Sequence, residues 1–136
     1  MYILLLGILI DLLSYDDIMT GMKKLPIWEI YVPAEHNGHK IPKEKHQEWD
    51  KMVCAIARGM TIKAATTGKW LNPSTKTILG EKMIQVELAC GESIIELIAT
   101  QTAGFYQQDA IYVVKTGRTA YIYDFSEPIY MGGLKE

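Results

Sequence analysis

Residues 82–89, KMIQVELA, alternate between apolar side chains and a mixed set, and this is the clearest structural pattern in the chain. Ile84, Val86 and Leu88 are apolar, and the positions between them are less so. Successive side chains of a strand point to opposite faces of a sheet. The stretch therefore predicts a central strand with one face in a core and the other against a mixed environment.

A strand, a loop and a helix are predicted upstream of this segment. Residues 27–32 alternate in the same way and end at Pro33, and residues 34–41 contain the turn pair Asn37-Gly38. Pro42 suits the first position of a helix, and Gly59 suits its C-terminal stop. The inner face of that helix is predicted from residues at helical spacing: His46, Trp49, Val53, Ile56 and Ala57.

The remaining elements lie on either side of the central strand. A strand over 60–65, with its pairing continued through 69–71, precedes a turn at Asn72-Pro73-Ser74. Gly91 opens a second helix that carries Ile94, Leu97, Ile98 and Phe105. Two short strands over 110–114 and 121–125 are predicted after it, separated by a turn at Lys115-Thr116-Gly117.

The order strand, helix, strand, strand, helix, strand predicts an α/β sandwich of the α+β class, a ferredoxin-like βαββαβ fold with an antiparallel sheet. Both helices then lie on one face of the sheet. Apolar residues such as Ile111, Val113 and Tyr31 fall on both faces, so the open face needs a cover. A second copy of the chain is the simplest cover, which predicts a homo-oligomer; the additional last strand is the alternative.

The length of 136 residues predicts one core, which we place in a single domain over residues 22–136. The apolar stretch over residues 2–13 is interrupted by Asp11 and is well short of the roughly 20 residues that a spanning helix requires. Met22-Lys-Lys-Leu resembles a second start, so as a hypothesis residues 1–21 are an appendage rather than part of the native domain. No membrane association is predicted, and the expected location is the cytoplasm.

Charge and cysteine content narrow the classes of partner. A formal net charge of -2, with scattered Lys and Arg, gives no reason to expect nucleic acid. Cys54 and Cys90 lie in apolar periodic segments and are expected to be buried, reduced thiols. His36, His39 and His46 match no closed zinc site, and the sequence contains no phosphate-binding glycine loop or dinucleotide fingerprint, so neither a metal nor a cofactor is predicted.

Glu81 is the residue for which chemistry is expected. It precedes the central strand and shares the parity of Met83, which directs it to the open sheet face, where a neighbouring subunit would make it a partly buried carboxylate. A solvated turn glutamate is the alternative. Trp70 could stack on a planar group or a cation, or simply pack, and Tyr106 and Gln108 end the second helix near the same rim.

The chain resembles the phage-encoded enzymes that degrade S-adenosylmethionine (SAM), first described as hydrolases and now as lyases. The resemblance covers roughly residues 27–125 and depends on an ordered set of segments: Ile30-Tyr31-Val32-Pro33, Trp49-Asp50, Gly68-Lys69-Trp70, residues 80–90 and residues 106–113.

The resemblance implies a trimer of ferredoxin-like subunits, similar to the nitrogen-regulatory signal proteins, with active sites between subunits. The essential glutamate of the family corresponds to Glu81 and an upstream aromatic to Trp70, whereas Tyr106 and Gln108 are predicted as substrate contacts from position alone. The resemblance also implies cleavage of SAM to methylthioadenosine and homoserine lactone, with hydrolysis as the lesser alternative. The role that it implies is counter-defence against restriction–modification in the host cytoplasm.

Two other classes of function are open. A non-catalytic oligomer could bind or sequester a small nucleotide-like ligand, because a fold does not determine a function. An interaction module could bind another protein on its open sheet face.

Overall fold

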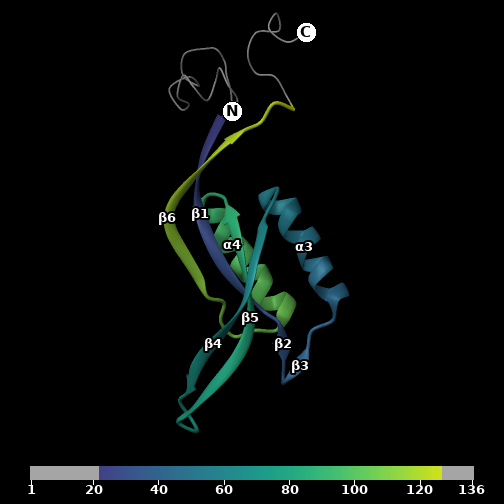
Figure 1. Ribbon diagram of the computed structural model, residues 1–136, viewed down its shortest axis with the longest axis vertical. Helices are drawn as coiled ribbons and strands as arrows, with labels where there is room; N and C mark the ends of the chain where they lie inside the picture. Colours follow the sequence, from purple (N-terminus) through teal and green to yellow (C-terminus); the bar gives the residue numbers. More distant parts are fainter. Residues whose placement is uncertain (1–21, 127–136) are drawn as a thin grey trace, which may run out of the picture. The chain divides into compact units, whose positions relative to one another are not determined.

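The computed structural model describes residues 22–126 (Figure 1). In chain order its elements are β1 Met22–Pro33, β2 Glu35–His36, β3 His39–Lys40, α3 Lys43–Ala57, β4 Thr61–Asn72, β5 Thr77–Ala89, α4 Glu92–Tyr106 and β6 Val113–Tyr123. The main sheet has four strands in the order β4-β5-β1-β6, and β2 and β3 form a small sheet of their own. This is the expected ferredoxin-like βαββαβ fold of the α+β class.

The described residues belong to two compact units, residues 26–118 and residues 22–25 with 119–126. The first unit holds both helices, the hairpin of β4 and β5, the C-terminal part of β1 and the N-terminal part of β6. The single domain expected over residues 22–136 stays a prediction, and the proposed appendage of residues 1–21 lies outside the described residues. Neither helix in the described part of the chain is long and apolar enough to cross a membrane.

Every pairing in the main sheet is antiparallel. β5 pairs with β4 on one side and with β1 on the other, where Ile30 lies opposite Val86. The amide of Tyr31 donates to the carbonyl of Tyr112 at 3.1 Å, and the hydroxyl of Thr116 donates to the carbonyl of Ile27 at 2.9 Å. Residue numbers therefore rise along β1 as they fall along β6, which makes this pair antiparallel as well.

The strands are longer than the sequence pattern predicts. β5 begins at Thr77 rather than Lys82, since its ladder with β4 continues to the turn, where the side chain of Asn72 accepts from the amide of Ser74 at 2.9 Å. The turn predicted at 115–117 is wrong, because β6 runs through it without a break. Gly117 takes a left-handed φ of 83° inside the strand, a conformation that glycine adopts at little cost.

The core lies between one face of the sheet and the two helices, which Figure 1 shows on the same side of it. As predicted, Trp28, Ile30 and Val32 face this core from β1, and Val86 and Leu88 face it from β5. The helices contribute fully buried or nearly buried side chains of Trp49, Val53, Ile95 and Ile98.

Two hydrogen bonds join the helices inside this core. The indole of Trp49 donates to the hydroxyl of Thr102 at 3.0 Å, and Thr102 itself donates to the carbonyl of Ile98 at 2.6 Å. The hydroxyl of Tyr106 lies 2.6 Å from Nδ1 of His46. Burial lowers the pKa of His46 and raises that of Tyr106, which favours an uncharged imidazole beside a protonated phenol.

Three local expectations for the helices need correction. The left-handed residue after α3 is Arg58, with φ of 72°, and not Gly59. Pro42 is the N-cap of α3 rather than its first helical residue. Cys90 is buried as expected, but Cys54 is exposed because it lies on the outer side of α3, next to the buried Val53.

The open face of the sheet carries charged side chains. Glu29 and Glu87 lie directly opposite each other on β1 and β5, an arrangement in which like charges repel. Arg118 from β6 bonds the carboxylate of Glu87, and Nζ of Lys63 lies 3.8 Å from the same group. The hydrogen bond from Arg118 lowers the pKa of Glu87 below its usual value.

Replacing Thr102 with valine should leave the buried indole N–H of Trp49 without an acceptor. We expect the free energy of unfolding to fall by about 1–3 kcal/mol in urea denaturation. Thr100→Val is the matched control. The hydroxyl of Thr100 also donates to the backbone carbonyl four residues earlier, that of Glu96, but Thr100 is exposed. Equal losses in the two variants would contradict this account.

Arg118→Met should lower the melting temperature at pH 7, because Glu29 and Glu87 then face each other without the guanidinium. The lowered pKa of Glu87 contributes stability above the ordinary glutamate pKa of about 4.3, and that contribution disappears as the pH falls through the lowered value. The difference between wild type and variant should therefore shrink on acidification. In a Glu87→Gln background Arg118→Met should have little effect; an undiminished effect there would refute the assignment.

Candidate functional site

The hairpin of β4 and β5 brings Trp70 and Glu81 together. Gly68 lies opposite Glu81 in the ladder and Trp70 opposite Leu79, so the two side chains are diagonal neighbours. The indole Nε1 of Trp70 donates to Oε1 of Glu81 at 3.0 Å. This bond orients the carboxylate and leaves its second oxygen for another partner.

Gly68 permits the indole to lie against the strand. A Cβ at this position would lie 3.1 Å from Sδ of Met83 and 3.5 Å from Nε1 of Trp70. The backbone of Gly68 thus forms the floor beneath the tryptophan, and Met83, only 7% exposed, packs beside it. A methyl group at residue 68 would crowd Sδ of Met83 and would touch the indole at ordinary van der Waals distance.

Two tyrosines extend the aromatic surface from the hairpin to β1 and the start of β6. The rings of Trp70 and Tyr112 meet edge to face with centroids 6.3 Å apart, and Tyr112 lies 5.3 Å from the ring of Tyr31. The hydroxyl of Tyr31 donates to Oε1 of Glu29 at 3.2 Å. Burial, with the nearby Glu29 charge, raises the pKa of Tyr31 and keeps the phenol protonated.

These side chains line a cavity of about 510 Å³, within the size range of small-molecule sites. The segment after α4 completes it with Gln108 and Asp109. Two carboxylates, Glu81 and Asp109, therefore belong to the lining, and the described residues that form it include no lysine, arginine or histidine.

The structure brings together three of the four residues singled out from the sequence. Trp70, Glu81 and Gln108 line this cavity, and Nε2 of Gln108 is held by the carbonyl of Tyr106 at 3.2 Å. Tyr106 itself lies elsewhere: it is 2% exposed, belongs to the helical core and borders a different cavity.

Sequence reasoning did not single out Tyr31, Tyr112 or Asp109 as site residues. The parity of β1 does place Tyr31 on the open face, but its neighbour Tyr112 follows only from the pairing of β1 with β6. Asp109 stands in an irregular segment between α4 and β6, where no periodicity indicates direction. The positions of Tyr112 and Asp109 therefore follow from how distant strands pair, which the local sequence pattern does not indicate.

The arrangement suits a ligand with a positive charge and a planar group. Aromatic faces attract cations through the ring quadrupole, and a carboxylate adds direct charge attraction. Trp70 and Tyr112 are 41% and 53% exposed, which leaves ring surface accessible to a ligand.

Comparison with known proteins supports the fold. No protein-family model matches the chain, and no curated protein sequence matches it. A phage SAM lyase solved in complex with S-methyl-5'-thioadenosine is similar in structure, with a TM-score of 0.51 at 12% identity over 74% of this chain and 91% of the lyase.

Two further structures match slightly less well. The phage SAM lyase in its apo state gives a TM-score of 0.47 at 12% identity, over 79% of this chain and 94% of the lyase. The divalent cation tolerance protein CutA1 from Thermus thermophilus gives 0.49 at 10% identity, over 71% and 86%. At these identities the likeness extends to the fold alone, and phage SAM lyase is among the proteins that share it.

Gly68→Ala should crowd Sδ of Met83 and place a methyl group in van der Waals contact with the indole of Trp70, beside its hydrogen bond to Glu81. We expect a clear shift of the Trp70 indole N–H resonance in ¹⁵N-edited NMR spectra. Gly80→Ala is the matched control on the same hairpin, since a Cβ there meets nothing within 4 Å. A shift of equal size in the Gly80 variant would contradict the close-packing argument.

Proposed function

We propose that this protein cleaves SAM to methylthioadenosine and L-homoserine lactone. The observation that carries the proposal is the cavity in which Glu81 and the indole of Trp70 meet beside Tyr112, with no basic residue among its described lining. SAM offers the matching chemistry: a sulfonium and an ammonium, both positively charged, and a planar adenine. The shared fold of the phage SAM lyase supports the same assignment.

The proposed reaction needs only the atoms of the substrate. A carboxylate oxygen of the methionyl arm attacks the γ-carbon, and the bond from that carbon to sulfur breaks. Its electron pair stays on sulfur and turns the sulfonium into the neutral thioether of methylthioadenosine. The other product is the five-membered lactone with its ammonium unchanged. Holding the arm in the folded conformation can contribute roughly 7–11 kcal/mol through orientation.

Glu81 is proposed to bind the ammonium of the substrate. Its Oε1 already accepts from Trp70, so the other oxygen can hold the amino group and thereby fold the arm toward the γ-carbon. Trp70 and Tyr112 would lie against the sulfonium or the adenine. Gln108, whose amide is fixed at the end of α4, could bond the ribose or the base.

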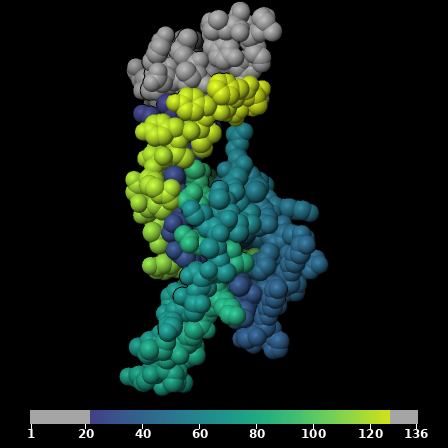
Figure 2. Space-filling model, viewed as in Figure 1, coloured from purple at the N-terminus to yellow at the C-terminus, as the bar shows by residue number. Residues whose placement is uncertain are grey.

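Self-association is part of the proposal, with a trimer as the expected state. The outer part of the β4–β5 hairpin extends away from α3 in Figure 2 and carries Leu71, Ile78 and Leu79 at 61%, 69% and 52% exposure. Exposed apolar side chains in such number are typical of a contact surface. A neighbouring subunit on this hairpin would close the cavity and remove water from the attacking carboxylate.

The biological role proposed is phage counter-defence in the cytoplasm of the host. Removal of SAM would deprive restriction–modification methyltransferases of their methyl donor. Neither a metal nor a cofactor takes part in the proposed chemistry.

Glu81→Gln should reduce kcat/KM for SAM by roughly tenfold to a hundredfold, the effect of losing one charged hydrogen bond. Product formation is followed by proton NMR of methylthioadenosine and homoserine lactone. Glu48→Gln makes the same charge change on the exposed side of α3 and should leave turnover unchanged. Full activity in the Glu81 variant would remove this residue from the site.

Turnover in H₂¹⁸O separates the lyase from its alternatives. Intramolecular attack gives unlabelled lactone first, and later opening of the lactone labels only the carboxylate. Hydrolysis, with Glu81 as a base, would place the label in the hydroxyl of homoserine instead. Tight binding of SAM without any product would reject catalysis and favour a sequestering oligomer.

A further inference from the structure

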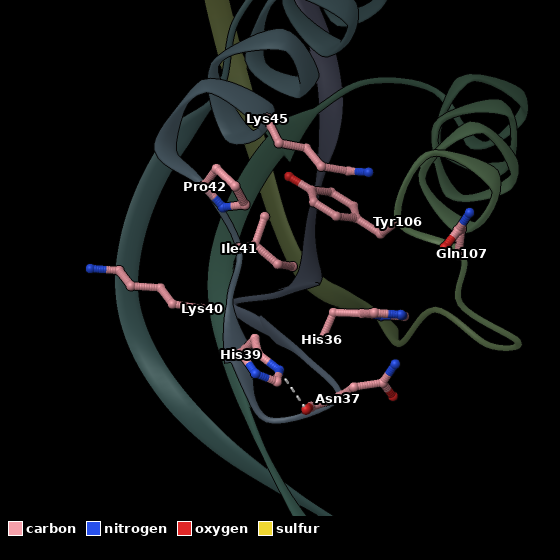
Figure 3. A pocket seen from close by; sticks show the side chains of 9 residues that line it. All are labelled: His36, Asn37, His39, Lys40, Ile41, Pro42, Lys45, Tyr106 and Gln107. Atoms are coloured by element: carbon pink, nitrogen blue, oxygen red, sulfur yellow. Dashed lines mark hydrogen bonds between the residues drawn. The ribbon is translucent and has the colours of Figure 1, made fainter.

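A second cavity, of about 460 Å³, lies between the β2–β3 hairpin and the ends of the helices (Figure 3). The hairpin supplies His36 and Asn37, α3 supplies Lys45 from its first turn, and α4 supplies Tyr106 with the following Gln107. No acidic residue is among the described residues that line it. Its charge is therefore opposite to that of the cavity around Glu81.

Lys45 provides the cationic centre of this cavity. Its Nζ lies 5.1 Å from the centre of the Phe105 ring and 5.9 Å from that of Tyr106, and these contacts hold the ammonium over α4. Within residues 22–126 no carboxylate lies within ion-pair distance of it. A cation held in place without a counter-charge is a site for an anion.

His36, Asn37 and Gln107 line the same cavity as Lys45. In Figure 3 the side chains of His36 and Asn37 extend in the same direction, whereas that of Lys40 points the opposite way. Nδ1 of His39 lies 3.0 Å from the carbonyl of Asn37, so that ring is engaged within its own turn. In the described part of the chain the ring of His36 makes no such hydrogen bond, which leaves it able to stack or donate.

The walls of the cavity are formed in advance of any ligand. Asn37 and Gly38 take left-handed φ values of 52° and 77°, which closes the hairpin turn. The amide of Ile41 donates to the carbonyl of Ala34 at 3.0 Å, and the side chain of Ile41 is only 6% exposed. Tyr106 forms the floor and is fixed by its bond to His46. A preformed site loses little entropy on binding.

We propose that this cavity is a second ligand site, which binds a small organic anion carrying a planar group. The carboxylate or phosphate of the ligand pairs with Lys45, the amides of Asn37 and Gln107 donate to it, and the planar group lies on the ring of His36. This site is separate from the one proposed for SAM and does not depend on SAM cleavage.

The test titrates the full-length protein with phenyl phosphate, benzoate, inorganic phosphate and phenol, using isothermal calorimetry and the side-chain amide resonances of Asn37 and Gln107. We expect saturable binding of phenyl phosphate, benzoate or both, with weaker binding of inorganic phosphate and of phenol. The preferred aromatic anion identifies the ligand group as phosphate or carboxylate. Failure of both aromatic anions to bind, or binding of phenol as tightly as either, would overturn the proposal.

Substitutions at Lys45 locate the binding. Lys45→Met should weaken the preferred anion at least tenfold, Lys45→Arg should retain it, and the control Lys51→Met, exposed on the same helix, should have no effect. Thermal melting of each variant verifies that it is folded. Unchanged affinity in Lys45→Met, or an equal loss in Lys51→Met, would refute the site. SAM turnover is measured in parallel in wild type, so failure here is distinguishable from failure of the proposed activity.

Discussion

Strand β5 hydrogen-bonds to β4 along one edge and to β1 along the other, and these two ladders determine where most other side chains lie. Val86 and Leu88 enter the helical core because Ile30 and Trp28 lie opposite them. Because successive side chains of a strand alternate between the two faces, Glu81 and Met83 then point to the other face. A shift of one residue in this register would exchange the core and the cavity, so packing of the helices and geometry of the site depend on the same hydrogen bonds.

The end of α4 separates two cavities of opposite charge. Tyr106 and Gln107 border the cavity around Lys45, and the next residue, Gln108, borders the one around Glu81. Gln107 takes a left-handed φ of 55°, and the amide of Gln108 returns to the carbonyl of Ala103 at 2.8 Å. This tight helix end turns consecutive side chains in different directions. Two distinct binding surfaces can therefore be formed from one short segment.

The strand β5 and the end of α4 differ in how well the sequence predicts the positions of their side chains. Alternation predicts the strand over 82–89 and the open-face position of Glu81, because a period of two is a local property. The sequence also predicts that Trp70 lies near Glu81, since the turn at Asn72-Pro73-Ser74 joins their two strands into one hairpin. Tyr106 is grouped with Gln108 in the prediction only because periodicity ends with the helix, and the residue instead packs in the core. Likewise the turn predicted at Gly117 overlooks that a paired strand can contain a left-handed glycine.

The charge distribution of the first cavity also bears on how a site with so few polar groups could accelerate the proposed reaction. The sulfonium loses its charge in the transition state, so a carboxylate placed against it would stabilise the substrate more than the transition state. The ammonium keeps its charge throughout, and a carboxylate bound there assists orientation without that penalty. Aromatic faces bind a cation more weakly than a carboxylate does. Glu81 fixed by Trp70 for the ammonium, with Tyr112 for the sulfonium, is therefore the division of roles most favourable to turnover.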